Sequence, residues 1–149
     1  MQKEIRSEWI YEQSPNEVWE YLTQAELIES WLMPNNFKPI HGNEFQFNAK
    51  PIPSLDLDGI FYCKVLEIIP FQKLTYSWKG GSGDGVFTLD TVVEWTLEKH
   101  GKGTKLLLKQ VGFKEINHSI FTAMTNGWQA NIQKMINFLN TKNNDSVSI

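Results

Sequence analysis

Apolar and polar residues alternate along residues 3–12. One side of an extended backbone carries Ile5, Ser7, Trp9 and Tyr11. The other side carries charged residues, beginning with Arg6 and Glu8. A period of two with one charged face is typical of a β-strand that covers a core on one side.

A helix start follows this strand. Ser14 can cap a helix, Pro15 suits the first helical position, and Glu17 stands three residues after Ser14, as a capping box requires. A second short helical segment over 25–31 brings Leu27, Ile28 and Trp31 together and ends before Pro34. We therefore expect two short helices after the first strand.

Strand patterns dominate the middle of the chain. They lie around Phe45 and Phe47 and over 59–69, 73–79, 86–99 and 104–113. Residues 50–58 hold two prolines and show no period, so they predict a loop, and the glycine-rich run 80–85 predicts a hairpin connection. In the strand over 86–99, one face carries Phe87, Leu89, Thr91, Val93, Trp95 and Leu97.

A long amphipathic helix is predicted over about 117–140. Its apolar stripe consists of Met124, Trp128, Ile132, Met135 and Leu139, at spacings of three and four. Gly127 interrupts this helix at a cost of about 1 kcal/mol relative to alanine. Close approach to the sheet or to a ligand would compensate for that cost, and so would a local kink. The polar residues 142–149 predict a disordered tail after a single domain over 1–141.

These elements predict an α+β fold. Consecutive strands joined by short turns make an antiparallel sheet of about six to seven strands, and the long helix has to bury its stripe on that sheet. A sheet of this length is strongly twisted and curved. A helix laid across a curved sheet need not fill the concave side, so a pocket between the two is expected.

Composition narrows the class of partner. The 149 residues carry a net charge of −3 with lysine and arginine scattered singly, which argues against nucleic acid and against a membrane surface. The first ten residues lack the apolar run of a signal peptide, no stretch approaches the length of a membrane-spanning helix, and Cys63 is the single cysteine. We therefore expect a cytoplasmic protein.

Aromatic residues make up 13% of the chain, which suits a core and equally the wall of a hydrophobic cavity.

Several strings, taken in order, resemble one protein superfamily. They are Pro15 with Val18-Trp19, AELIESW over 25–31, MPNNFKP over 33–39, GNEFQF over 42–47, IPFQKLTYSW over 69–78, the hairpin TVVEWTLEKHGKGTKLLLKQVGF over 91–113, and Gly127-Trp128-Gln129. Together they resemble the helix-grip fold of the START-related, birch-pollen-allergen-like proteins (SRPBCC). Within it, they are similar to the family homologous to the activator of the heat-shock-protein-90 ATPase. The resemblance covers about 5–140 and implies a curved sheet around a C-terminal helix. It carries no catalytic motif, and this fold hosts transporters, enzymes and chaperone partners.

Candidate reactive groups stand apart from one another. His41, His100 and His118 fall at turns or at a helix start, without a partner at metal-ligand spacing, so we expect no metal, no cofactor and no catalytic set. Cys63 lies in a strand without a neighbouring base, which indicates a packed thiol.

Glu67 lies in a largely apolar strand, and whether it faces inward depends on the strand register. The run 80–85 lacks the Gly-Lys-Ser/Thr ending of a phosphate loop.

The aromatic residues remain as the candidate binding site. The residues expected to line a pocket are Trp9, Trp31, Trp78, Phe87, Leu89, Trp95, Met124 and Trp128. Plain core packing of the same residues is the alternative, and the sequence leaves both open. In the helix-grip fold that the chain resembles, the two short helices close one end of the concave side of the sheet, so the resemblance implies that the aromatic surface around Trp19 and Trp31 both caps the core and closes a cavity.

The sequence thus predicts a protein that is not an enzyme and that binds a hydrophobic small molecule in an internal pocket between the sheet and the last helix. The resemblance adds an alternative, a module that interacts with a chaperone. A cyclase or hydrolase of the same fold is a third reading, which would require a buried polar pair. We expect a monomer or a homodimer.

Overall fold

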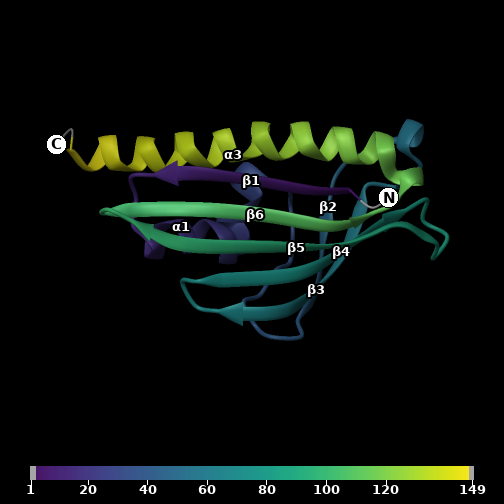
Figure 1. Cartoon of the computed structure of the whole chain (residues 1–149), viewed down its shortest axis with the longest axis horizontal. Helices are drawn as coiled ribbons and strands as arrows, with labels where there is room; N and C mark the ends of the chain where they lie inside the picture. Colours follow the sequence, from purple (N-terminus) through teal and green to yellow (C-terminus); the bar gives the residue numbers. More distant parts are fainter. Residues whose placement is uncertain (1–2, 148–149) are drawn as a thin grey trace.

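A six-stranded antiparallel sheet, in the order β1-β6-β5-β4-β3-β2, forms the body of the protein (Figure 1). The computed structural model describes the backbone of residues 3–147 and the side chains of residues 3–141. The strands are β1 (Lys3–Tyr11), β2 (Glu44–Asn48), β3 (Ile60–Ile69), β4 (Lys73–Gly81), β5 (Phe87–His100) and β6 (Gly103–Phe113). The helices are α1 (Pro15–Thr23), α2 (Ala25–Trp31) and α3 (His118–Val147), with short 3-10 turns at Pro53–Leu55 and Glu115–Asn117.

The first strand lies beside the last. Strands β2 to β6 pair with their neighbours in chain order, whereas β1 pairs with β6. Figure 1 shows α3 running the length of the sheet close to β1, with the N-terminal helices packed at the opposite end from the start of α3. This is the predicted α+β helix-grip fold, with two short helices after the first strand.

The start of α1 follows the predicted cap. The backbone N–H of Glu17 donates to Oγ of Ser14 over 3.4 Å, and Pro15 occupies the first helical turn. At the end of α2, the indole nitrogen of Trp31 donates to the carbonyl oxygen of Tyr21 over 2.8 Å. This bond joins the two short helices into one cap on the core.

The stripe of α3 faces the sheet. Trp128, Ile132, Met135 and Leu139 are buried, and Met124 is half-buried. The helix continues to Val147, beyond the predicted end near residue 140, so residues 142–147 have a helical backbone where a disordered tail was expected. Residues 148 and 149 of that predicted tail lie outside the described residues.

A bulge between β4 and β5 changes the predicted face of Phe87. Gly80 pairs with Leu89 but Gly81 pairs with Phe87, so Thr88 is an extra residue in β5. Phe87 therefore points to the outer face and is 42% exposed, whereas Leu89 is buried inside. The bulge needs glycine at position 81, because a Cβ there would collide with the carbonyl oxygen of Val86.

The strand register also decides whether Glu67 faces inward. Its carboxylate lies 3.3 Å from Nζ of Lys73, which also lies 3.4 Å from the Glu94 carboxylate. These bonds raise the pKa of Lys73. Glu67 is thus a partly exposed member of an ion-pair cluster and does not point into the core.

Candidate ligand-binding site

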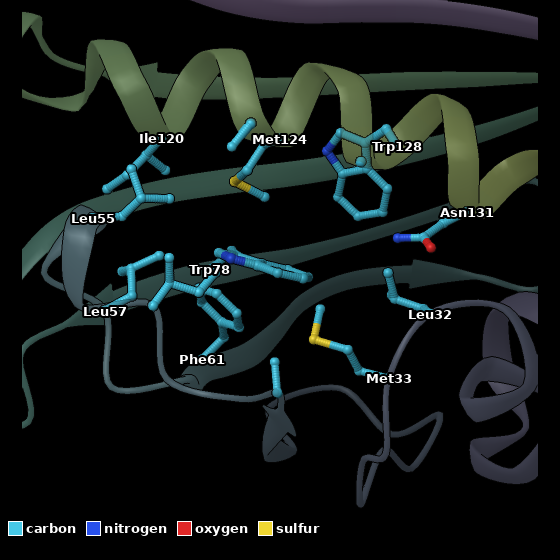
Figure 2. A pocket seen from close by; sticks show the side chains of 14 residues that line it. Leu32, Met33, Leu55, Leu57, Phe61, Trp78, Ile120, Met124, Trp128 and Asn131 are labelled. Carbon is cyan, nitrogen blue, oxygen red and sulfur yellow. The ribbon is translucent and has the colours of Figure 1, made fainter.

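A cavity of ≈ 180 Å³ lies between the sheet, the N-terminal half of α3 and the loop before β3 (Figure 2). Its lining consists of Leu32, Met33, Ala49, Ile52, Leu55, Leu57, Phe61, Trp78, Ile120, Ala123, Met124, Gly127, Trp128 and Asn131. Ala49, Ile52 and Ala123 are exposed, whereas Phe61, Trp78 and Trp128 are buried. The cavity therefore has a mouth on the solvent side and an aromatic floor.

The floor is a continuous aromatic surface. The Trp78 ring lies 5.0 Å from Phe61 and 5.6 Å from Trp128, measured between ring centroids. Trp128 in turn meets Trp95 edge-on at 5.4 Å. Tilted and edge-on pairs of this kind add to the stability that area burial provides and restrict ring motion. The floor is therefore preformed for an apolar or aromatic molecule.

Helix α3 supplies a second wall, which joins the floor at Trp128. Ile120, Met124 and Trp128 follow one another at intervals of four residues, so their side chains share one helix face (Figure 2). Gly127 lies on the same wall, and a Cβ at that position would meet no atom within 4 Å outside its own helix. Gly127 thus faces open space. Close packing of the helix against the sheet therefore does not compensate for the helix propensity that the glycine loses.

The loop over residues 49–58 forms the third wall. Ile52 and Leu57 exchange backbone hydrogen bonds of 2.9 and 3.2 Å, and the N–H of Ala49 donates to the carbonyl of Gly59 over 2.7 Å. The Pro53–Leu55 turn lies between them. These bonds hold the loop in a compact form that turns Leu55 and Leu57 toward the cavity (Figure 2).

A buried chain of hydrogen bonds fixes the orientation of Trp128. Its Nε1 donates to Oε1 of Gln110 over 2.9 Å. Nε2 of Gln110 donates to Oγ1 of Thr91, and Thr91 donates to the carbonyl oxygen of Trp78, both over 2.9 Å. The chain runs behind the floor and satisfies the polar groups of Gln110 and Thr91.

Three of the predicted lining residues meet in the cavity. Trp78 comes from β4, and Met124 and Trp128 come from α3. All three side chains line the cavity; Trp78 and Trp128 are also buried in the core, and Met124 packs against it.

The other five predicted residues lie outside the lining. Trp31 and Trp95 are fully buried and meet edge-on at 6.0 Å, and Leu89 is buried in the core. Phe87 lies on the outer face beside Tyr62, for the reason given above.

Trp9 is also displaced from the cavity. It is half-buried, and its indole nitrogen donates to Oε1 of Gln129 over 3.3 Å. Nε2 of Gln129 donates to Oγ of Ser7 over 3.1 Å. Trp9 therefore ties β1 to α3 at the edge of the sheet.

Several lining residues were not anticipated. Ile120 stands four residues before Met124, so extending the helical stripe by one turn would have found it. Leu32 and Met33 directly follow Trp31, in a segment with no period. Leu55 and Leu57 lie in the proline-containing loop, and no local pattern indicates that they turn inward.

Comparison with known proteins identifies the family. Residues 12–140 match the family described as activator of Hsp90 ATPase homolog 1-like protein. The chain belongs to this family. A comparison with curated proteins found no match.

Solved structures share the fold of this family member. Protein MLL2253 from Mesorhizobium loti is 31% identical, with a TM-score of 0.83 over 93% of this chain and 98% of that one. Protein BH1534 from Bacillus halodurans is 21% identical, with a TM-score of 0.72 over 92% of this chain and 98% of the other. The Aha1 dimer from Colwellia psychrerythraea is 15% identical, with a TM-score of 0.72 over 89% of this chain and 92% of that one.

Reactive groups in this member of the family stand apart from the cavity. Cys63 is buried on β3, and burial raises the pKa of its thiol, so the thiol stays protonated at neutral pH. His41, His100 and His118 are exposed. Among the described residues, no three His, Cys, Asp or Glu side chains gather as metal ligands would. No helix in the described part of the chain is long and apolar enough to cross a membrane.

Proposed function

We propose that this protein binds a small apolar molecule in the cavity between the sheet and α3. The observation that carries the proposal is the lining: among the described residues that form it none is charged, Asn131 supplies the one side-chain amide, and Trp78 and Trp128 form the floor. Apolar walls with few polar groups are typical of small-molecule sites. A cavity of about 150 Å³ suffices for a benzene ring, so ≈ 180 Å³ suits a molecule built on one ring.

Open space on α3 supports ligand binding over plain packing. In a packed core, a mid-helix glycine allows a neighbouring element to approach closely. Gly127 has no such neighbour within 4 Å of a Cβ position, and Met124 beside it is half-buried. The volume next to this wall is thus available to a ligand.

Two tryptophan substitutions on α3 test the proposal. Met124→Trp adds volume to the cavity wall, whereas Ile132→Trp adds volume at a position that is 0% exposed in the packed core. With cumene (isopropylbenzene) as the probe, we expect the wild-type protein to show changed tryptophan fluorescence and a negative heat-capacity change of binding. Met124→Trp should keep the stability of the wild type and lose cumene binding. Ile132→Trp should cost about 1–3 kcal/mol through overpacking.

The result that contradicts the proposal is equally clear. If the wild-type protein does not bind cumene, and Met124→Trp destabilises the fold as much as Ile132→Trp does, the aromatic residues act as core alone.

The family match supports a second candidate, a module that interacts with a chaperone. This function would use the outer surface and not the cavity. Its test is the ATPase rate of Hsp90 with and without the purified protein. A rise that Met124→Trp leaves unchanged would assign the effect to a surface away from the cavity, and no change in rate would exclude this candidate for the Hsp90 used.

A further inference from the structure

Trp78 carries a buried hydrogen-bond donor with no acceptor in the described part of the protein. Its side chain is 1% exposed, and its Nε1 has no partner there. Three other buried indoles are paired, each over 2.8 or 2.9 Å: Trp31 with the carbonyl of Tyr21, Trp95 with the hydroxyl of Tyr76, and Trp128 with Gln110. An unpaired buried donor is costly to stability, so Trp78 calls for an explanation.

The position of Trp78 offers one. Its indole lies on the floor of the cavity, between Phe61 and the wall formed by α3 (Figure 2). Nearly every other group on the lining ends in carbon or sulfur. Asn131 lies at the far end of the cavity near Leu32. Its amide can donate or accept a hydrogen bond, so it does not determine whether a ligand must carry a donor or an acceptor. The indole N–H can only donate. A molecule in this cavity that satisfies Trp78 must therefore present an acceptor.

The charge of the lining constrains that molecule further. The lining includes no lysine, arginine, histidine, aspartate or glutamate among the described residues. Burying an unpaired carboxylate or ammonium group there is strongly unfavourable, because no group of opposite charge in the lining replaces the water that the ion loses. A neutral acceptor such as a carbonyl, ether or hydroxyl oxygen avoids this cost.

Resting on the proposed function, we infer that the ligand is a neutral, single-ring molecule whose oxygen accepts a hydrogen bond from Nε1 of Trp78. The ring occupies the apolar space under Met124 and Ile120, and the oxygen lies toward the indole nitrogen. Because that nitrogen is buried, the oxygen can reach it only after a neighbouring side chain changes rotamer.

Three probes of similar size test this inference. Acetophenone has a ring and a neutral acceptor, cumene has the same shape without the acceptor, and benzoate carries a charge. The dissociation constants are measured for the wild type, for Trp78→Phe, which keeps an aromatic ring and removes the donor, and for Met124→Leu. The last variant is the control, because it alters the lining without removing a donor.

The quantity to compare between variants is the ratio of the cumene Kd to the acetophenone Kd. The hydration of each free probe is the same for every variant, so it cancels in this comparison. We expect the ratio to fall about threefold to tenfold in Trp78→Phe and to stay constant in Met124→Leu. Benzoate should bind at least tenfold more weakly than acetophenone. If Trp78→Phe does not fold, the indole N–H signal of Trp78 in the wild-type NMR spectrum replaces it. That signal should move downfield with acetophenone and not with cumene.

Each failure has a distinct meaning. If neither acetophenone nor cumene binds to the wild type, the proposed function fails and the inference falls with it. If both bind, but the ratio in Trp78→Phe equals that of the wild type or the indole signal responds equally to both probes, the hydrogen bond is overturned while the binding function stands. Benzoate binding as tight as that of acetophenone overturns the neutral ligand class.

Discussion

The indole nitrogen of Trp128 on α3 donates a hydrogen bond to Oε1 of Gln110 on β6, 2.9 Å away. Trp128 is 3% exposed and Gln110 is 0% exposed, so water cannot replace either partner. The bond fixes the rotation of α3 on the sheet and holds the Trp128 ring at the cavity floor.

Replacing Gln110 with methionine should therefore destabilise the protein. The side chain keeps a similar volume, but the Trp128 N–H loses its acceptor in a buried site, at a cost of about 1–3 kcal/mol. The measurement is the free energy of unfolding in urea. Lys109→Met, at the neighbouring position on the outer face, is the control and should change stability by less than about 0.5 kcal/mol. Equal losses in both variants would contradict a specific role for the bond.

Gly127→Ala should stabilise the fold and weaken binding. Alanine is favoured over glycine inside a helix by about 1 kcal/mol, and the added methyl group meets no atom within 4 Å outside its own helix. The same methyl group narrows the cavity, so the Kd for cumene should rise. Asn126→Ala, at the exposed neighbouring position, is the control that changes helix propensity without touching the lining. A less stable Gly127→Ala variant would show that the space is not available.

Ser14→Ala should loosen α1. The substitution removes the acceptor for the Glu17 N–H, and losing such a cap costs about 1 kcal/mol. Hydrogen exchange should become faster at residues 15–22. Asn16→Ala, in the same turn but without a cap bond among the described contacts, should leave exchange unchanged. Identical exchange in the Ser14 variant and the wild type would mean that the cap does not stabilise the helix.

Stability should fall at alkaline pH. Burial raises the pKa of the Tyr11 and Tyr76 hydroxyls above the ordinary value of 10.0 and the pKa of the Cys63 thiol above 9.0. Below about pH 8 these groups are almost entirely neutral in both states, so stability does not depend on their titration. At higher pH the unfolded chain releases their protons first, so each group lowers the free energy of unfolding by up to about 1.4 kcal/mol per pH unit.

Tyr76→Phe tests this pH dependence by urea unfolding between pH 8 and 11. The variant should be less stable at pH 8, because the Trp95 N–H loses its acceptor, yet its stability should fall less steeply with pH. Tyr62→Phe removes a hydroxyl at an exposed position and is the matched control. The same slope in all three proteins would count against a protonated, buried Tyr76 hydroxyl as its source.

Elements with short-range signals were predicted correctly. The Ser14 cap and Pro15 act within one helical turn, so the start of α1 depends on neighbours in the sequence alone. The alternation in β1 and the stripe from Trp128 to Leu139 each report the buried face of one element, because helices and strands have fixed periods. From these elements and their order, the sequence by itself determined the antiparallel sheet and the helix that covers it.

The contents of the cavity depended on contacts between distant segments. Phe87 lies on the outer face because of a bulge in β5. The position of this bulge is set by the pairing of Phe87 with Gly81 and by the close approach of the Val86 carbonyl to Gly81. Leu57 turned inward because backbone bonds to Ile52 shape a loop that has no period. A periodic pattern indicates which face of an element is buried, but not which atoms lie opposite it. Only the tertiary structure therefore decided that Trp78 faces a cavity, and that its N–H, unlike that of Trp128, meets no acceptor among the described residues.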